Sequence, residues 1–363
     1  MKRSKQSPLD LSLYLPALHL TQKSLRPLDT LVRHSDRWRD VSIFLFPPFF
    51  PSQSFAPAQA KLPMLQSIQL KDDSEESSDL KISPIHFLNV TPSLHTLRLS
   101  PTLLELEDLL LPWAQIRILS LYDAYSARAL PFLQKCSNLV ELELSHVGEG
   151  DDFEGHILLN TLSSLVVRSV SGPEDVDDIL TYTTLPALTH LVIEGDSDDG
   201  EFAWREWDTD ALTDFVDRSA CHITSLHLSR APIDDEQVLS LLKRMPGLEC
   251  LHLEDAPNVD DRVVTPDLLE GLVVEPGCSS LTYPTTQPLV PRLTDLKLVT
   301  PEDWENWYDG DTMQKAFLKM LSSRWFSEDA VPRDGLARLL TVEIVVSTEE
   351  TLENFEPLRC FKD

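Results

Sequence analysis

Residues 223–253 read ITSLHLSRAPIDDEQVLSLLKRMPGLECLHL. The stretch begins and ends on the same phrase, ITSLHL and LECLHL, with aliphatic residues at its first, fourth and sixth positions. Neighbouring side chains of a strand point to opposite faces, so the last two aliphatic residues share one face and the histidine between them lies on the other. Between the phrases, Asp234 to Met245 carries Val238, Leu241 and Leu242 at helical spacing, and an Asp or Thr at the start of such a segment can cap a helix. The stretch therefore predicts a strand, a helix and a second strand.

The same phrase recurs along most of the chain. It starts at Leu65, Leu94, Ile116, Leu139, Leu162, Leu188, Ile223, Leu248 and Leu293, with a weaker last copy through Leu340, Val342 and Ile344. Successive starts are 29, 22, 23, 23, 26, 35, 25 and 45 residues apart, and leucine-rich repeats are ~20–29 residues long. Stacked copies bury a face that no copy buries alone. The fold expected is α/β, an irregular leucine-rich-repeat solenoid (a horseshoe) with parallel strands on its concave face and helices or loops on its convex face.

The longer spacings predict insertions, or a degenerate copy marked by Val273 and Val274. A second helix is expected over Asp210–Ala220. The asparagine that usually follows the strand is missing, and small residues such as Ala231 and Ala256 stand there, so helices are expected to pack closely. The expected organisation is an N-terminal helix and strand cap with a Pro- and Phe-rich loop over residues 1–60, leucine-rich repeats over 61–300, and a C-terminal cap with a last helix and strand over 301–363.

Charge excludes several classes of partner. The 363 residues carry a net charge of −28, with +5 on residues 1–61 and −33 on the rest. So acidic a surface repels phosphate backbones and anionic lipids, and we expect neither nucleic acid nor membrane as a partner. The five cysteines are odd in number and form no CxxC pair, and no signal peptide is recognised. A reducing compartment, cytoplasmic or nuclear, is therefore expected.

Motifs of catalysis are missing. The sequence contains no GxSxG, P-loop, GxGxxG or HExxH pattern, and only 11 glycines. We expect no enzyme activity, no cofactor and no metal.

The concave sheet face is the first candidate for binding a protein, because solenoids present such stripes to their partners. A merely solvated face is the alternative that stays open. The candidate residues are those between the leucines and beside them: Arg98, Ser120, Tyr122, Glu141, Glu143, Arg168, His190, Glu194, His227, His252, Glu254 and Lys297.

Three of these, His190, His227 and His252, fall at comparable places on nearby strands. A metal site would need them to converge with a carboxylate such as Glu254, and strands ~4.8 Å apart allow this geometry. Because solvated histidines on a sheet are commoner, the prediction is a solvated group without metal.

Other conspicuous features are expected to be structural. The pairs Trp204/Trp207 and Trp304/Trp307 are expected to be buried, and the Phe-rich loop of residues 44–60 to be held against the repeats by its phenylalanines. Four acidic runs are expected to be solvated loops that steer a basic partner: residues 72–79, 149–154, 174–178 and 196–201.

Several segments resemble a known family. Residues 233–261, IDDEQVLSLLKRMPGLECLHLEDAPNVDD, resemble the cysteine-containing repeats of F-box/leucine-rich-repeat proteins, with Ala256 in the cysteine position. PLDLSLYL (8–15) and LDTLVRHSDRWRDVSIFL (28–45) resemble the segment that follows the F-box in fungal F-box proteins, and FLKMLSSRW (317–325) resembles their C-terminal helix before the last strand.

The resemblance implies substrate recognition for an SCF-type ubiquitin ligase. An F-box, a helical segment with a Leu-Pro-x-Glu-like start, is not found here; in the family it lies upstream of these segments. A Skp-type adaptor and a cullin are therefore expected partners only if an F-box is present upstream. The alternative is a free-standing leucine-rich-repeat scaffold or regulator that is not coupled to ubiquitination.

Overall fold

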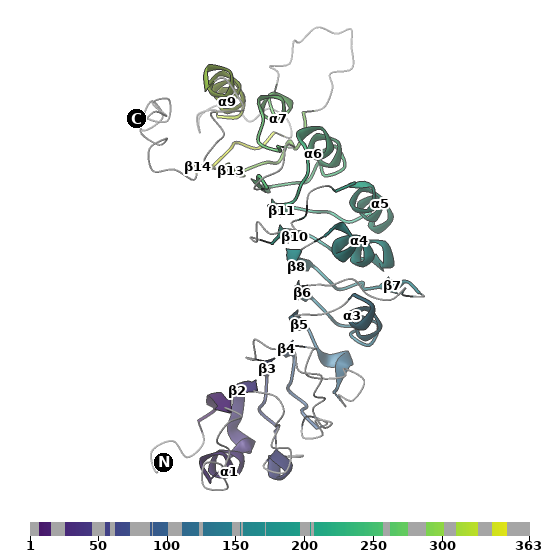
Figure 1. Ribbon diagram of the computed structural model, residues 1–363, viewed down its shortest axis with the longest axis vertical. Coiled ribbons are helices and arrows are strands. Elements are labelled where there is room, and N and C mark those ends of the chain that lie inside the picture. Colours follow the sequence, from purple (N-terminus) through teal and green to yellow (C-terminus); the bar gives the residue numbers. More distant parts are fainter. Residues whose placement is uncertain are drawn as a thin grey trace. The chain divides into compact units, whose positions relative to one another are not determined.

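The computed structural model (Figure 1) describes the chain in segments. They are residues 7–15, 26–45, 55–58, 62–72, 88, 90–100, 111–122, 126–146, 153, 155–170, 172–196, 204, 207–256, 262–274, 288–300, 310–325 and 336–346. The chain forms two compact units. The first is Met1–Leu165 with Tyr182–Leu185, and the second is Val166–Thr181 with Pro186–Asp363.

The first unit is built on a parallel ladder whose strands follow chain order. The strands are β1 (Leu9–Leu15), β2 (Trp38–Leu45), β3 (Ser67–Asp72), β4 (Thr96–Leu99), β5 (Ile118–Tyr122) and β6 (Glu141–Ser145). The register places the aliphatic residues of successive repeats side by side: Leu97 lies opposite Leu119, and Leu119 lies opposite Leu142. A separate two-stranded pair joins β7 (Ile157–Leu158) to β9 (Thr183–Thr184).

Short helical segments and aromatic side chains complete the core of the first unit. The helices are α1 (Arg26–Val32) and α3 (Ser126–Leu133), with 3₁₀ turns at Ser35–Arg37, Ala56–Ala58 and Trp113–Gln115. Phe55 is fully buried and packs edge-on against Trp38, with ring centroids 6.4 Å apart. For Phe55 this confirms that the Phe-rich loop is held by its phenylalanines; most of that loop lies outside the described residues.

The second unit continues the same architecture. Its strands are β8 (Ser164–Val170, which starts in the first unit), β10 (His190–Gly195), β11 (Ser225–Ser229), β12 (Cys250–Glu254), β13 (Asp295–Thr300) and β14 (Thr341–Val346). Leu226, Leu251 and Leu296 lie directly opposite one another, and each is buried. The expected α/β leucine-rich-repeat fold is thereby confirmed for the described residues.

The 45-residue spacing between the phrases that start at Leu248 and Leu293 comes from an insertion between two paired strands. β12 pairs directly with β13, so no strand stands between them. Val274 is buried, but it follows helix α7 (Pro266–Gly271) outside the ladder. The prediction of a degenerate copy at Val273 and Val274 is therefore wrong, because a buried valine beside a half-buried one serves helix packing as readily as a strand.

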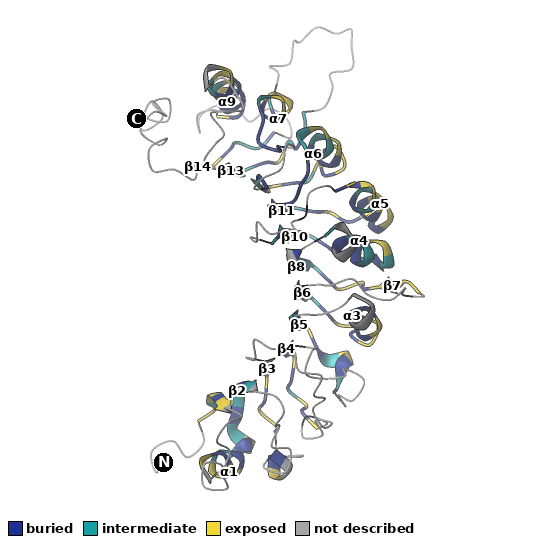
Figure 2. Cartoon of the chain, viewed as in Figure 1, coloured by how far each residue is buried: buried dark blue, intermediate teal, exposed yellow. Residues whose placement is uncertain are grey.

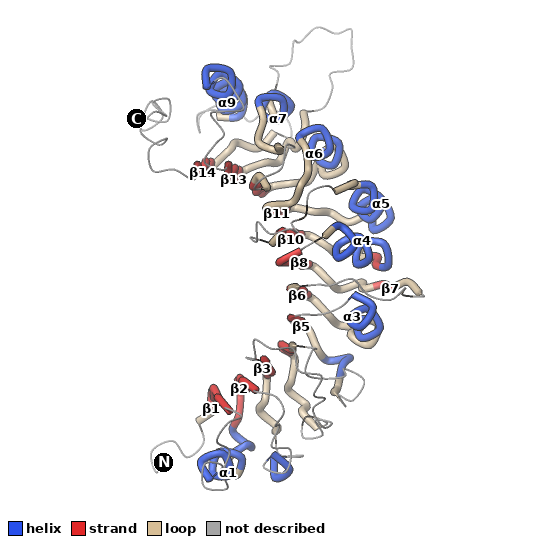
Figure 3. Tube along the Cα trace, viewed as in Figure 1, coloured by secondary structure: helices blue, strands red, loops and turns tan. Residues whose placement is uncertain are grey.

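Helices of the second unit lie on one side of its strands (Figures 1 and 3). They are α4 (Pro173–Tyr182), α5 (Asp210–Ser219), α6 (Asp235–Leu242), α7 and α9 (Gly310–Arg324). One face of these helices and the aliphatic positions of the strands carry buried residues (Figure 2). Ala231 and Ala256 are buried at the turns, as the small-residue pattern predicts. None of the described helices is both long enough and apolar enough to cross a membrane.

Of the two helices expected to start with a capping side chain, α6 has such a cap and α5 does not. At the start of α6, the Asp234 carboxylate accepts a hydrogen bond from the Gln237 backbone N–H at 2.7 Å, and the Gln237 side chain accepts one from the Asp234 N–H at 3.0 Å. This reciprocal pair satisfies two backbone donors that the helix leaves open. Thr209, before α5, makes no such side-chain bond.

The Trp204/Trp207 pair and the acidic run at 174–178 both contribute buried side chains to the second unit. Trp204 and Trp207 are 7% and 3% exposed, and the Trp207 indole donates to Asp177 at 3.0 Å, so their structural role is confirmed. The acidic run at 174–178 lies in α4 and not in a loop, because Val176 and Ile179 bury one face of it. Trp304 and Trp307, and most of the other acidic runs, lie outside the described residues.

Candidate protein-binding face

In each unit, the residue between two buried aliphatic residues of a strand points to the sheet face opposite the core. We call this surface the open face. In the second unit its central row is formed by residues that lie directly opposite one another on β10 to β14. They are Val192, His227, His252, Lys297 and Glu343.

The first unit holds five of the predicted residues. Arg98, Ser120 and Glu143 are in register on neighbouring strands. Tyr122 lies two residues after Ser120 and Glu141 two residues before Glu143, so both share that face. Ser120 is only 2% exposed, and its hydroxyl donates to Glu143 at 3.0 Å. Larger neighbouring side chains cover the small Ser120 side chain, which therefore presents no surface of its own. Its hydrogen bond orients Glu143.

The second unit holds the other seven, and a cluster of ion pairs joins two of them. The Glu194 carboxylate binds Arg168 through one oxygen and Arg230 through the other. Arg230 follows β11 and has a left-handed backbone, with φ of 53°. Its side chain is 25% exposed and that of Glu194 is 21% exposed. The three side chains fix one another's positions and leave Arg168, which is 45% exposed, the most open to solvent.

Gly195 makes this cluster possible. A Cβ atom at this position would lie 2.2 Å from the Arg230 carbonyl oxygen, far inside contact distance. Only glycine lets the chain after β11 approach β10 so closely. Sequence reasoning missed Arg230, since nothing in its neighbourhood announces a left-handed turn. The isolated Gly195 at the end of a strand phrase was the available signal.

His227 and His252 are the most closely packed pair on the face. Their rings stack with centroids 3.7 Å apart and planes 16° from parallel. Burial, and second the nearby His252, lowers the pKa of His227 to about 4. Burial, followed by the charge of Lys297, also lowers the pKa of His252. Both imidazoles are therefore neutral at pH 7.

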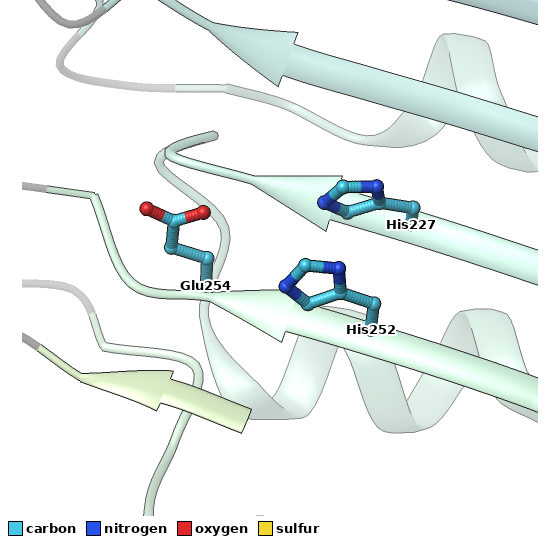
Figure 4. A group of neighbouring side chains, drawn as sticks. All are labelled: His227, His252 and Glu254. Carbon is cyan, nitrogen blue, oxygen red and sulfur yellow. The ribbon is translucent and has the colours of Figure 1, made fainter. Parts of the chain in front are cut away.

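The stack ends at a carboxylate. Figure 4 shows one nitrogen of each ring turned toward Glu254, which comes from the end of β12. Ser229, on β11, donates its hydroxyl to one oxygen of Glu254. His227, His252 and Glu254 each offer a ligand atom, and these three atoms lie within 4.8 Å of one another.

His190 stands apart from this group. It is exposed, and its ring nitrogen Nδ1 hydrogen-bonds with the Thr189 hydroxyl at 2.8 Å. The expectation of solvated histidines therefore holds for His190. His227 and His252 are less open, and both are half-buried, because two imidazoles in register on adjacent parallel strands cover each other.

Lys297 completes the row with a partner that sequence reasoning did not name. Its ammonium lies 3.3 Å from the Glu343 carboxylate, and the two side chains are 38% and 54% exposed. Glu343 is the middle residue of the weak last repeat, so the repeat pattern itself was the signal that locates it.

The chain has similar proteins among the solved structures. The chain is similar to the leucine-rich-repeat-containing protein LegL7 from Legionella pneumophila, with 14% identity and a TM-score of 0.44 over 93% of this chain and 91% of that one. No protein-family model matches the chain, and no curated protein matches it. The assignment of the fold accordingly rests on the register of the ladder, and the resemblance to F-box proteins rests on the quoted residues.

Proposed function

We propose that the chain is a non-enzymatic protein-binding module whose partner docks on the open face of the second unit. One observation carries the proposal. Polar and charged side chains stand in register along β11 to β14, partly exposed, while the described helices of that unit lie on the other side of the strands.

The state of these side chains suits recognition. Glu194 holds two arginines, and Lys297 is paired with Glu343, so the charges are already oriented before a partner arrives. Binding then loses less side-chain entropy than it would with free chains. Arginine is also among the residues that contribute most to interface affinity. The acidic chain favours a partner with a basic contact surface, since complementary charge raises the association rate.

Capture of the partner from host lysate, followed by affinity measurement with the purified partner, tests the proposal. Lys297→Glu on the open face is compared with Lys243→Glu, an exposed lysine at the end of α6 on the helix side. Both variants change the net charge by the same amount. We expect Lys297→Glu to weaken binding by about tenfold or more, because it replaces the Lys297–Glu343 ion pair by two like charges and so disturbs the pre-oriented docking surface. Lys243→Glu makes the same change in net charge away from that surface and should leave binding within about twofold. Equal effects, or none from Lys297→Glu, would place the binding surface elsewhere.

The finer role we propose is substrate recognition for an SCF-type ubiquitin ligase. It is supported by the resemblance of residues 8–15, 28–45, 233–261 and 317–325 to F-box/leucine-rich-repeat proteins. We further propose that the protein works in the cytoplasm or nucleus, where thiols such as the exposed Cys250 stay reduced.

A pull-down with the tagged chain, once alone and once extended into any upstream coding sequence, distinguishes the two roles. Recovery of a Skp-type adaptor and a cullin with either form supports the ligase role. Recovery of other partners without the adaptor supports the alternative, a scaffold or regulator that is not coupled to ubiquitination.

A further inference from the structure

Among the described residues, the imidazoles of His227 and His252 on the open face each hold a buried nitrogen without a hydrogen-bond partner. The two atoms are Nε2 of His227 and Nε2 of His252. A buried polar atom without a partner costs free energy, so such atoms in a folded protein call for an explanation such as an ion. Here both belong to rings that stack together and turn one nitrogen the same way, toward Glu254 (Figure 4).

Glu254 has an oxygen to spare. Ser229 hydrogen-bonds to Oε2 of Glu254, and among the described residues no lysine or arginine forms an ion pair with this carboxylate. The neighbouring cations are engaged elsewhere: Arg168 and Arg230 bind Glu194, and Lys297 binds Glu343. A cation at the end of the histidine stack therefore meets one uncompensated negative charge and two neutral imidazoles.

We propose that His227, His252 and Glu254 form a binding site for a divalent transition-metal ion, with Zn²⁺ as the reference ion. Two imidazole nitrogens and one carboxylate oxygen are a ligand set that zinc accepts, and imidazole disfavours Ca²⁺ and Mg²⁺. The site goes beyond the proposed partner binding and does not depend on it.

The geometry requires a small local rearrangement. Zinc binds nitrogen at ~2.0–2.1 Å and carboxylate oxygen at ~2.0–2.2 Å. The three ligand atoms, all within 4.8 Å of one another, must therefore draw together. The nearly parallel rings must also tilt so that both Nε2 lone pairs point at one ion. Rotation about side-chain bonds accomplishes this, and the strand register keeps the two histidines side by side.

Three protein ligands leave a fourth position open. In tetrahedral zinc sites such a position holds water or an incoming ligand. All three ligands stand on the open face and are half-buried, so the ion would lie on the side of the strands away from the leucine core.

Titration of the purified, metal-free full chain with ZnCl₂ by calorimetry tests the site. We expect one ion per chain with a dissociation constant on the order of micromolar or below, and a Zn²⁺-dependent rise in melting temperature. His227→Gln and His252→Gln should each weaken binding by about a hundredfold, and Glu254→Gln by about tenfold or more. His190→Gln is the matched control, an exposed histidine on the same unit's ladder, and should leave binding unchanged.

A second measurement does not depend on variants that fold. Crystals of the wild-type chain soaked in Zn²⁺ should show an anomalous peak at the zinc edge among the three side chains. No saturable binding, no peak at this place, or equal loss of binding with His190→Gln would each overturn the proposal. The last result would mean adventitious binding to surface histidines.

Discussion

At the scale of single residues, His227 makes the folded state sensitive to acid. Its ring is withdrawn from water against His252, and its pKa is about 4 where 6.5 is ordinary. Above pH 6.5 the residue is neutral in both the folded and the unfolded chain. As pH falls toward 4, the unfolded chain takes up a proton that the folded chain does not, so stability is full above pH 6.5 and is lost as pH falls through 4.

We expect this titration to remove roughly 1–2 kcal/mol between pH 7.5 and pH 4. Each pKa unit corresponds to about 1.4 kcal/mol, and the partial exposure of His227 reduces the full effect through solvent screening. Urea unfolding of the metal-free chain at the two pH values measures it. The loss should shrink in His227→Gln and persist in His190→Gln. A loss of the same size in His227→Gln would assign the acid sensitivity to other groups.

Arg324 ties the end of α9 to three backbone carbonyl groups. It is 0% exposed at the end of α9, and its guanidinium donates to the carbonyl oxygens of Leu272, Leu289 and Val290 at 2.7, 2.6 and 3.1 Å. Burial lowers its pKa to about 10, so it remains charged at pH 7.

Arg324→Met should destabilise the protein by about 2–4 kcal/mol, because it leaves buried carbonyl groups without donors. Lys319→Met on the exposed face of the same helix should change the stability by less than about 0.5 kcal/mol. Denaturant unfolding of both variants decides the matter. Similar midpoints for the two would show that water takes over the carbonyls.

At the scale of elements, the leucine rows carry the stability of the ladder. Leu251 is 1% exposed and lies between Leu226 and Leu296 on the neighbouring strands. Leu251→Ala should cost about 2–5 kcal/mol. Cys250→Ala, one residue earlier and on the other face, should cost less than about 0.5 kcal/mol. Hydrogen exchange should show lost protection in β11, β12 and β13 for the first variant alone.

The starts of α5 and α6 offer a second matched comparison. Asp234→Ala removes the reciprocal cap of α6 and should lower stability by about 1 kcal/mol. Thr209→Ala removes a side chain that makes no cap hydrogen bond and should lower stability by much less. Both are measured by urea unfolding. A cost for Thr209→Ala equal to that of Asp234→Ala would mean that packing, and not capping, sets the difference.

Elements with a strict period were predictable from the sequence. The strand phrases located β3, β4, β5, β6, β8 and β10 to β14, and helical spacing located α5 and α6. β1 and β2 were harder to place within the repeats, since their phrases lack the spacing of the others, yet they pair in the same ladder. Val273 and Val274 misled because two adjacent valines carry no period at all.

At the scale of the whole molecule, charge sets how fast a partner arrives. With a net charge of −28, the chain should attract a basic protein over distances that salt shortens. For the captured partner, raising NaCl from about 0.05 to 0.5 M should slow association by about tenfold or more and change dissociation much less. Stopped-flow or surface-based kinetics give both rates. An association rate that is constant or rises with salt would contradict steering by this charge.

The candidate site was only partly readable from the sequence. The alternation of strands placed His227, His252 and Lys297 on one face, because that depends on chain order alone. The pairing of Glu194 with Arg230 depends on a left-handed turn, and the burial of both Nε2 atoms depends on how two rings settle against each other. Both features depend on tertiary contacts, which the spacing of aliphatic residues in the sequence does not reveal.

The direct pairing of β12 with β13 separates two kinds of change in this chain. Forty residues lie between Glu254 and Asp295, yet the strand returns in the register it would have after a short repeat. A longer or shorter segment between β12 and β13 changes the helix side of the strands. It leaves the order of the side chains on the open face unchanged. Gene duplication, insertions and engineered changes in this segment can therefore alter the helix side, while the order of the side chains presented to a partner stays the same.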